Sequence, residues 1–300
     1  MELNLYIFNF YNLYNIYKME RKLVKQGAGA LTLTLPANWI KKNNLTQEDV
    51  VFIKESKNQL ILCNNSSINE KETKIDIKNL EKGYAFHLVT GKYIEGYDKI
   101  ILEHNNLELS QKIGKSFLGM VIEEHTDKHL IMRDIIKIPS DNFVEIFKRS
   151  CQILIQQVRL LKKFSEGNAT FEQVKKEERL LDSNLFYCLR YINKYEKIEN
   201  SYKYFLLTTT MESVGDLISE IGEYLKKEKI TLKEKEILEL IVETVEKYVL
   251  YLFQNNMKKM YETLKIKNRN FYQKSFVGGV ALAIREALYN YIGYLVPKKE

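Results

Sequence analysis

One stretch decides the fold of the N-terminal region, namely RKLVKQGAGALTLTLPANWI at residues 21–40. Leucines at 31, 33 and 35 alternate with threonines, which places the leucines on one face of a strand. Gly27 and Gly29 permit the backbone angles of a tight turn before that strand. Pro36 suits the first turn of a helix, where its missing N–H would have no acceptor. The stretch therefore predicts strand, glycine turn, strand and helix.

A second pair of strands follows directly. VVFI at 50–53 and QLIL at 59–62 are joined by the polar ESKN at 55–58, as in a hairpin. Fewer than about fifty residues with this much strand cannot bury a core alone. We therefore expect this module to pair with another copy.

This order of elements resembles the DNA-binding module of the AbrB, SpoVT and MazE group, and the match covers about Glu20 to Cys63. The resemblance implies that two copies intertwine into one swapped-hairpin β-barrel whose basic residues face DNA. By position, the implied DNA-binding residues are Arg21, Lys22, Lys25, Lys41 and Lys42. The alternative is that these residues only solubilise the surface.

The composition indicates a multidomain protein with ordinary solubility. The chain has 300 residues, of which 45% are hydrophobic and 28% charged, which leaves room for two or three domains. A net charge of +7 favours polyanions without requiring them. No run of about eighteen apolar residues predicts a membrane span. Cys63, Cys151 and Cys188 lack metal-ligand spacing and predict buried thiols in the cytoplasm.

Residues 1–18 are expected to be a leader without function. They lack the basic start and the small-residue cleavage site of a signal peptide. Because Met19 stands directly before the hairpin stretch, we expect translation to begin there.

A small α+β middle domain is predicted at 67–138, after an AbrB-like domain at 19–66. Apolar runs between glycine turns at 83, 91 and 96 predict strands near Ile75 and Ile77, at 85–89 and at 100–102. A helix at 110–118 and strands at 120–124 and 129–132 are expected to complete it.

An antiparallel helical bundle is predicted at 139–300. Ser140 or Asp141 can cap the first helix, and capping boxes open helices at Thr170 and Thr231. The third helix, about 201–227, carries one apolar stripe, and a fifth is expected at 272–295. The predicted fold class is therefore α+β multidomain.

Two helices of the bundle carry acidic pairs. Glu212 and Asp216 are four residues apart on the third helix, away from its apolar stripe, and Glu178 and Asp182 repeat the spacing on the second. Like charges at this spacing repel, and a cation would relieve the repulsion. The candidate metal ligands are Glu178, Asp182, Glu212 and Asp216, for iron or a divalent ion. The alternative is a solvated acidic face.

The segment MESVGDLISE at 211–220 resembles the acidic signature of PhoU proteins, and the likeness covers about 142–296. PhoU domains are three-helix repeats that hold metal ions and regulate phosphate uptake. Ser213 replaces the Arg expected after the Glu, and the segment at Arg285 lacks an Asp to complete a second motif. An AbrB-like module ahead of such a bundle is similar to archaeal phosphate uptake regulators.

These resemblances imply a dimeric DNA-binding regulator of phosphate homeostasis. A second interpretation is an accessory protein that docks on a phosphate transporter ATPase and does not bind DNA. An antitoxin-like module is a third, which the long bundle argues against.

No enzymatic activity is expected, because the sequence has no nucleophile elbow, phosphate loop or dinucleotide fingerprint. His125 and His129 flank Asp127 and are interpreted as a polar hairpin turn rather than a metal site. His87 and His104 have no partners that spacing identifies.

Overall fold

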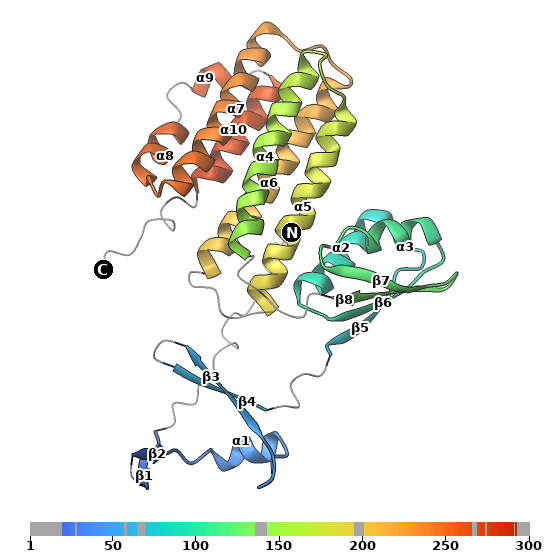
Figure 1. Ribbon diagram of the computed structural model, residues 1–300. Coiled ribbons are helices and arrows are strands. Elements are labelled where there is room, and N and C mark those ends of the chain that lie inside the picture. Colours follow the sequence, from blue (N-terminus) through green and yellow to red (C-terminus); the bar gives the residue numbers. More distant parts are fainter. Residues whose placement is uncertain are drawn as a thin grey trace, which may run out of the picture. The chain divides into compact units, whose positions relative to one another are not determined.

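The computed structural model describes residues 20–27, 29–56, 59–64, 70–135, 143–194, 201–265, 269–273, 275–290 and 292. The predicted leader, Met19 and the expected caps Ser140 and Asp141 lie outside these residues. The chain divides into two compact units, 1–69 and 70–300, which are described separately. The fold is α+β, with small sheets and a helical C-terminal region (Figure 1).

The first unit contains two hairpins and one short helix. Strands β1 (Val24–Gln26) and β2 (Ala30–Thr32) pair antiparallel, and so do β3 (Val51–Ser56) and β4 (Gln59–Asn64). Gly27 lies at φ 71, the left-handed conformation that the first turn requires. Helix α1 (Ala37–Lys42) starts one residue after Pro36, which is its N-cap. The two predicted hairpins, the glycine turn and a helix after the proline are present. The strand predicted to include Leu33 and Leu35 ends at Thr32, and Pro36 stands before the helix in an extended conformation rather than in its first turn.

The second unit begins with a four-stranded sheet in the order β5-β6-β8-β7. Strand β5 (Glu72–Asp76) runs parallel to β6 (Lys99–Glu103), and helix α2 (Lys82–Ile94) connects them. After helix α3 (Leu107–Gly114), β7 (Met120–His125) and β8 (His129–Asp134) form a hairpin whose second strand pairs antiparallel with β6. The last two strands agree with the prediction.

The strand predicted at 85–89 is wrong, because these residues lie in α2. Ala85, Val89 and Tyr93 are fully buried at a spacing of four, which is the period of one helix face. Glu81 caps the helix by accepting hydrogen bonds from the N–H groups of residues 83 and 84. The glycines at 83 and 91 are therefore helical, and only Gly96, at φ 87, turns the chain.

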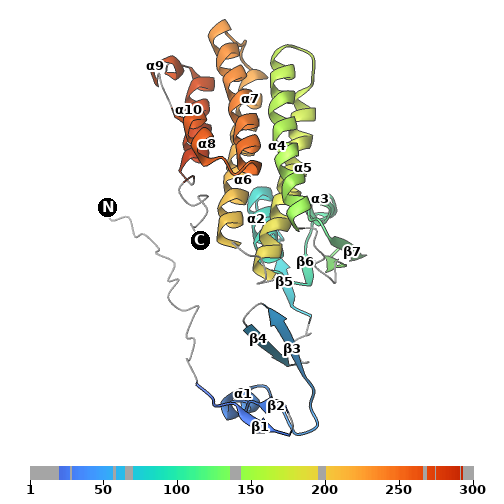
Figure 2. The same ribbon diagram turned by 60° about the vertical axis from the view of Figure 1, so that its left-hand side comes forward.

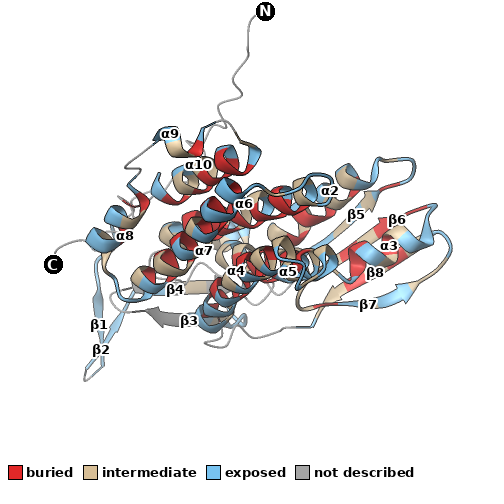
Figure 3. Ribbon diagram, turned by 90° about the horizontal axis from the view of Figure 1, so that it is seen from above, coloured by how far each residue is buried: buried red, intermediate tan, exposed pale blue. Residues whose placement is uncertain are grey.

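Long helices make up the rest of the second unit and pack around one core (Figure 2). They are α4 (Phe143–Ser165), α5 (Phe171–Lys194), α6 (Ser201–Leu225), α7 (Leu232–Phe253) and α10 (Phe276–Tyr289). Both predicted capping boxes form, at Thr170 and at Thr231. Buried and exposed residues alternate along the helices (Figure 3). In α6 the buried residues include the predicted stripe from Leu207 to Ile221, and in the later turns of α5 the whole run 184–188 is buried.

The C-terminal part differs from the prediction of one helix at 272–295. Ser275 accepts a hydrogen bond from the N–H of Gly278 and caps α10, so the helix starts at Phe276. Two short helices precede it, α8 (Met257–Leu264) and α9 (Arg269–Tyr272). Within the described residues, no helix is both long and apolar enough to cross a membrane.

A buried ion pair joins the sheet to the helices, across the boundary predicted near residue 138. The Arg190 side chain of α5 is 4% exposed and lies 2.6 Å from Oδ2 of Asp134, which is 7% exposed. The same guanidinium donates to the carbonyls of Tyr93 and Tyr97. Burial opposes ionisation of Asp134, but hydrogen bonds from Lys194 and Arg190 outweigh it and lower its pKa.

Removing the Arg190 guanidinium should destabilise the second unit strongly. Arg190→Ala leaves two carbonyls without this donor and leaves the buried Asp134 carboxylate with Lys194 as its partner. We expect a loss of about 3 kcal/mol in the free energy of unfolding. The control is Arg159→Ala, which removes an exposed pair with Glu246 and should cost less than about 1 kcal/mol. Denaturant titration of both variants measures the difference, and equal losses would contradict the role given to Arg190.

Candidate functional site

Close packing of α5 against α6 creates the candidate site. A Cβ atom at Gly215 would lie 2.7 Å from Cδ2 of Leu181 on α5, a distance that real side chains do not adopt. Gln157 of α4 donates to the Gly215 carbonyl at 2.9 Å and to the Ser219 hydroxyl at 3.2 Å. Glycine at 215 thus lets the two helices touch at the level of the acidic pairs.

The four predicted carboxylates, which we call the acidic cluster, lie on these touching helices. Glu178 is 8% exposed, Asp182 and Glu212 are half-buried, and Asp216 is exposed. A fully solvated face would leave all four in water. The solvated-face alternative therefore does not fit Glu178, and it fits the exposed Asp216 only in part, because neighbouring atoms still shield its carboxylate from water.

Burial and mutual repulsion shift the cluster toward its neutral form. Burial, followed by the charges of Asp216, Glu178 and Glu212, raises the pKa of Asp182 to about 8. Burial and then Asp216 raise the pKa of Glu212, and burial and then Glu178 raise that of Asp216. The members therefore sense one another across the two helices.

The sequence analysis did not identify two basic side chains near the cluster. Lys175 forms an ion pair with Glu178 one turn away on α5, a spacing that the sequence does show. His87 of α2 offsets a small part of the rise in the pKa of Glu212 and of Asp216, and only the fold reveals this proximity. Lys175 and Glu178 line two neighbouring grooves of about 580 and 720 Å³.

The four carboxylates of the cluster do not converge on one position where an ion could bind. Across the ranges given above, no group of three or more His, Cys, Asp or Glu side chains is arranged to hold a metal ion. The arrangement can take up protons, and it can take up a cation if the half-buried side chains change rotamer.

The predicted DNA-binding residues lie in the first unit. Arg21, Lys22 and Lys25 flank and enter β1, and Lys41 and Lys42 end α1. All five side chains are exposed. They supply positive charge on the two elements that the family resemblance assigns to DNA.

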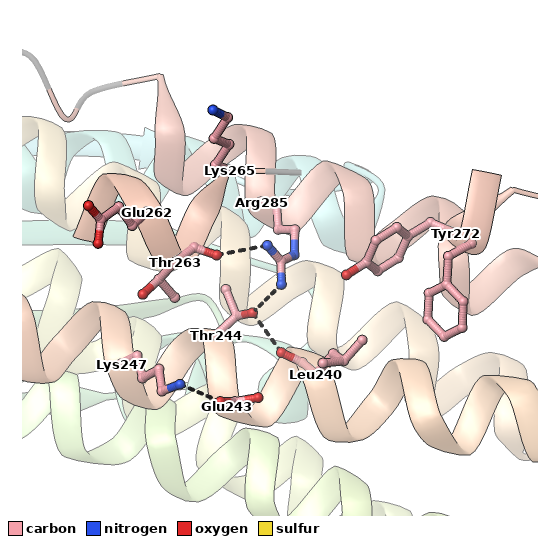
Figure 4. A pocket seen from close by; sticks show the side chains of 10 residues that line it. Leu240, Glu243, Thr244, Lys247, Glu262, Thr263, Lys265, Tyr272 and Arg285 are labelled. Atoms are coloured by element: carbon pink, nitrogen blue, oxygen red, sulfur yellow. Dashed lines mark hydrogen bonds and ion pairs between the residues drawn. The ribbon is translucent and has the colours of Figure 1, made fainter. Parts of the chain in front are cut away.

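A pocket of about 340 Å³ lies between α7, α8 and α10 and contains Arg285 (Figure 4). Its guanidinium donates to the Thr263 carbonyl at 2.9 Å and to the Thr244 hydroxyl at 3.0 Å. Glu286, the next residue, pairs instead with Arg269. The segment that lacks the Asp of a second acidic motif thus places the positively charged side chain of Arg285 in this pocket.

The cysteine prediction holds for two of the three thiols. Cys151 and Cys188 are free and buried, and burial raises the pKa of each to about 12. The side chain of Cys63 lies outside the described residues.

Comparison with known proteins gave no match to a family model, a curated protein or a solved structure.

The raised pKa of Asp182 predicts an unusual pH dependence of stability. Between its ordinary value of 3.8 and about 8, the folded chain holds a proton that the unfolded chain has released. The contribution of Asp182 to stability is therefore lost as pH rises through this window. Asp182→Asn, which cannot ionise, should raise the melting temperature at pH 8 and leave it nearly unchanged at pH 4.

Calorimetry of wild type and variant at the two pH values, with chelator present, measures this effect. The control is Asp76→Asn, an exposed carboxylate of β5 outside the cluster. A variant that is equally or less stable than wild type at pH 8 would show that Asp182 is ionised in the fold.

Proposed function

We propose that this protein is a dimeric, DNA-binding transcriptional regulator of phosphate uptake that acts in the cytoplasm. Two copies of residues 19–66 form its swapped-hairpin barrel, and the helices of the second unit form a PhoU-like bundle that transmits the signal. The observation that carries the proposal is that the described residues of the first unit form no buried core.

Every residue of the first unit whose burial is described is exposed or half-buried. Its strands and their flanks nevertheless carry many large apolar side chains that are 48–68% exposed, namely Leu23, Val24, Leu31, Leu33, Val50, Phe52, Ile53 and Leu60. An apolar surface of this extent marks an interface. Because the resembling family pairs two copies of this module, the occupant that we propose is a second copy of the chain.

The exposed basic residues support DNA as the ligand of that dimer. Two copies double the positive charge that Arg21, Lys22, Lys25, Lys41 and Lys42 supply, and clustered cations bind phosphates by releasing counterions. Phosphate homeostasis as the regulated process rests on the family resemblances alone.

The acidic cluster fits a bound cation in its chemistry. Its carboxylates supply the oxygen ligands that magnesium, calcium and iron accept, and three of them have raised pKa values because they repel and are partly buried. An ion there would neutralise the repulsion and bridge α5 and α6. Glu178, Asp182, Glu212 and Asp216 would hold it.

The second candidate function is an accessory protein that dimerises through the barrel and docks its bundle on a phosphate transporter ATPase. The grooves beside the acidic cluster favour it, because both lie outside the DNA-binding module. One lies on the bundle along α5, α6 and α10, and the other lies between α5 and the helices α2 and α3. Salt-dependent binding to DNA separates the two functions.

Replacing Arg21, Lys22 and Lys25 together by Ala should weaken binding to the promoter region of the protein's own gene. Each lost phosphate contact removes roughly one unit from the slope of log affinity against log salt concentration. Fluorescence anisotropy across a salt series measures both quantities.

The matched control replaces three exposed lysines of the second unit, Lys112, Lys128 and Lys258, and so changes the charge equally. The control should retain affinity and slope. If wild type fails to bind, or the basic triple variant binds as wild type does, DNA binding by this surface is refuted.

A divalent cation should raise the melting temperature of wild type, because it binds the folded chain preferentially. Glu212→Gln combined with Asp216→Asn should abolish that increment while leaving the metal-free protein equally or more stable. The control, Glu239→Gln with Glu243→Gln, removes two carboxylates of α7 that pair with lysines. Calorimetry measures the rise in melting temperature on adding the cation, and elemental analysis measures the bound metal. If both double variants show the same rise in melting temperature, a metal at the cluster is excluded.

A further inference from the structure

Three of the four histidines of the chain meet at one end of the sheet in the second unit. His104 follows β6, His125 ends β7, and His129 begins β8. The backbone N–H of His104 donates to the Lys128 carbonyl at 2.9 Å, which fixes the end of β6 against the β7–β8 turn. Residues 25 positions apart in sequence are thus brought together by strand pairing, and no spacing rule could reveal this.

The rings of His104 and His125 are close but do not hydrogen bond. Their centroids are 5.9 Å apart. His104 is 2% exposed, and both of its ring nitrogens, together with Nε2 of His125, are buried without a hydrogen-bond partner among the residues that the structure describes. Buried polar atoms normally find partners, so three unsatisfied nitrogens in one place require an explanation.

The third histidine is engaged differently. Nε2 of His129 lies 2.9 Å from the Glu124 carboxylate, and its Nδ1 lies 3.1 Å from the Thr126 hydroxyl. His129 is therefore satisfied by local contacts in the turn. His104 and His125 alone keep free nitrogens at this corner.

We propose that His104 and His125 form a binding site for one borderline transition-metal ion such as copper or zinc, with water completing the coordination. Two imidazoles at about 2.1 Å from one ion have ring centroids roughly 5 Å apart in tetrahedral and 6.5 Å apart in linear geometry, and the observed separation lies between these values. Imidazole nitrogen is a preferred ligand of copper, zinc and nickel.

The surroundings of the pair suit this role. The amide nitrogen of Gln111 lies 3.2 Å from Nδ1 of His125. Turning this amide over would place its oxygen there to accept the Nδ1 proton and leave Nε2 to ligate.

The site is distinct from the acidic cluster in position and in ligand chemistry. The cluster offers only carboxylate oxygens, whereas this corner offers imidazole nitrogens from the sheet. Copper(II) bound through two imidazoles shows nitrogen couplings in its electron paramagnetic resonance spectrum, and copper bound by carboxylates does not. The spectrum therefore assigns the ion to one site or the other.

The experiment adds one equivalent of copper(II) to the full chain and records the spectrum and the affinity. Wild type should show coupling to two nitrogens, and His104→Phe and His125→Phe should each lose it and bind at least about tenfold more weakly. The control, His87→Phe, removes an exposed histidine of α2 and should behave as wild type. Circular dichroism verifies folding, and the half-buried His125 keeps the test valid if His104→Phe unfolds. Absence of nitrogen coupling in wild type, or its persistence in a folded His104→Phe or His125→Phe variant, would overturn the proposal.

Discussion

The second unit depends on the close approach of α5 to α6 at Gly215. The helices are near enough that a methyl group there would collide with Leu181, and Gly222 meets the ring of Phe171 in the same way one heptad later. This approach buries the apolar stripe of α6, and it also forces the carboxylates of the two helices together. Packing and charge repulsion therefore arise from the same contact, and burial together with this repulsion raises the pKa values of three of the carboxylates.

Helix α5 links this contact to the sheet. The end nearer its N-terminus carries Lys175, Glu178 and Asp182, and its last turns carry Arg190 and Lys194, which bind Asp134. A rigid helix fixed by a buried ion pair at one end has little freedom to relieve repulsion at the other. Protonation of Asp182, whose pKa burial and the neighbouring carboxylates raise, lowers this repulsion.

The first unit shows the opposite condition, because its strands carry exposed apolar side chains and none of its residues whose burial is described is buried. Its hairpins and helix were predictable, since alternating leucines, a glycine turn and a proline are local signals. Capping boxes and the stripe of α6 were predictable for the same reason. Residues 85–89 were predicted as a strand because a short apolar run does not by itself distinguish a strand from a helix. The N-cap at Glu81 is the local signal that marks the start of helix α2. The short helices α8 and α9 carry too little periodicity to predict.

The spacing of the acidic residues in the sequence identifies them as candidates. Their burial and their neighbours could not be predicted from the sequence. Whether Glu178 faces water depends on which side of α5 meets α6, and that follows from long-range packing at Gly215 rather than from local pattern. The proximity of His87 to the cluster and of His104 to His125 depends on sheet topology. Contacts between residues distant in sequence thus account for most of what the sequence did not reveal.

The most direct test of the enforced repulsion at the α5–α6 contact is the titration of the Asp182 carboxyl carbon by NMR, with chelator and then with magnesium. We expect the titration midpoint of Asp182 to lie near pH 8 when chelator is present, in line with its pKa of about 8. With magnesium bound, we expect the midpoint to fall by several units. A midpoint near the ordinary value of 3.8 in chelator, unchanged by magnesium, would contradict it.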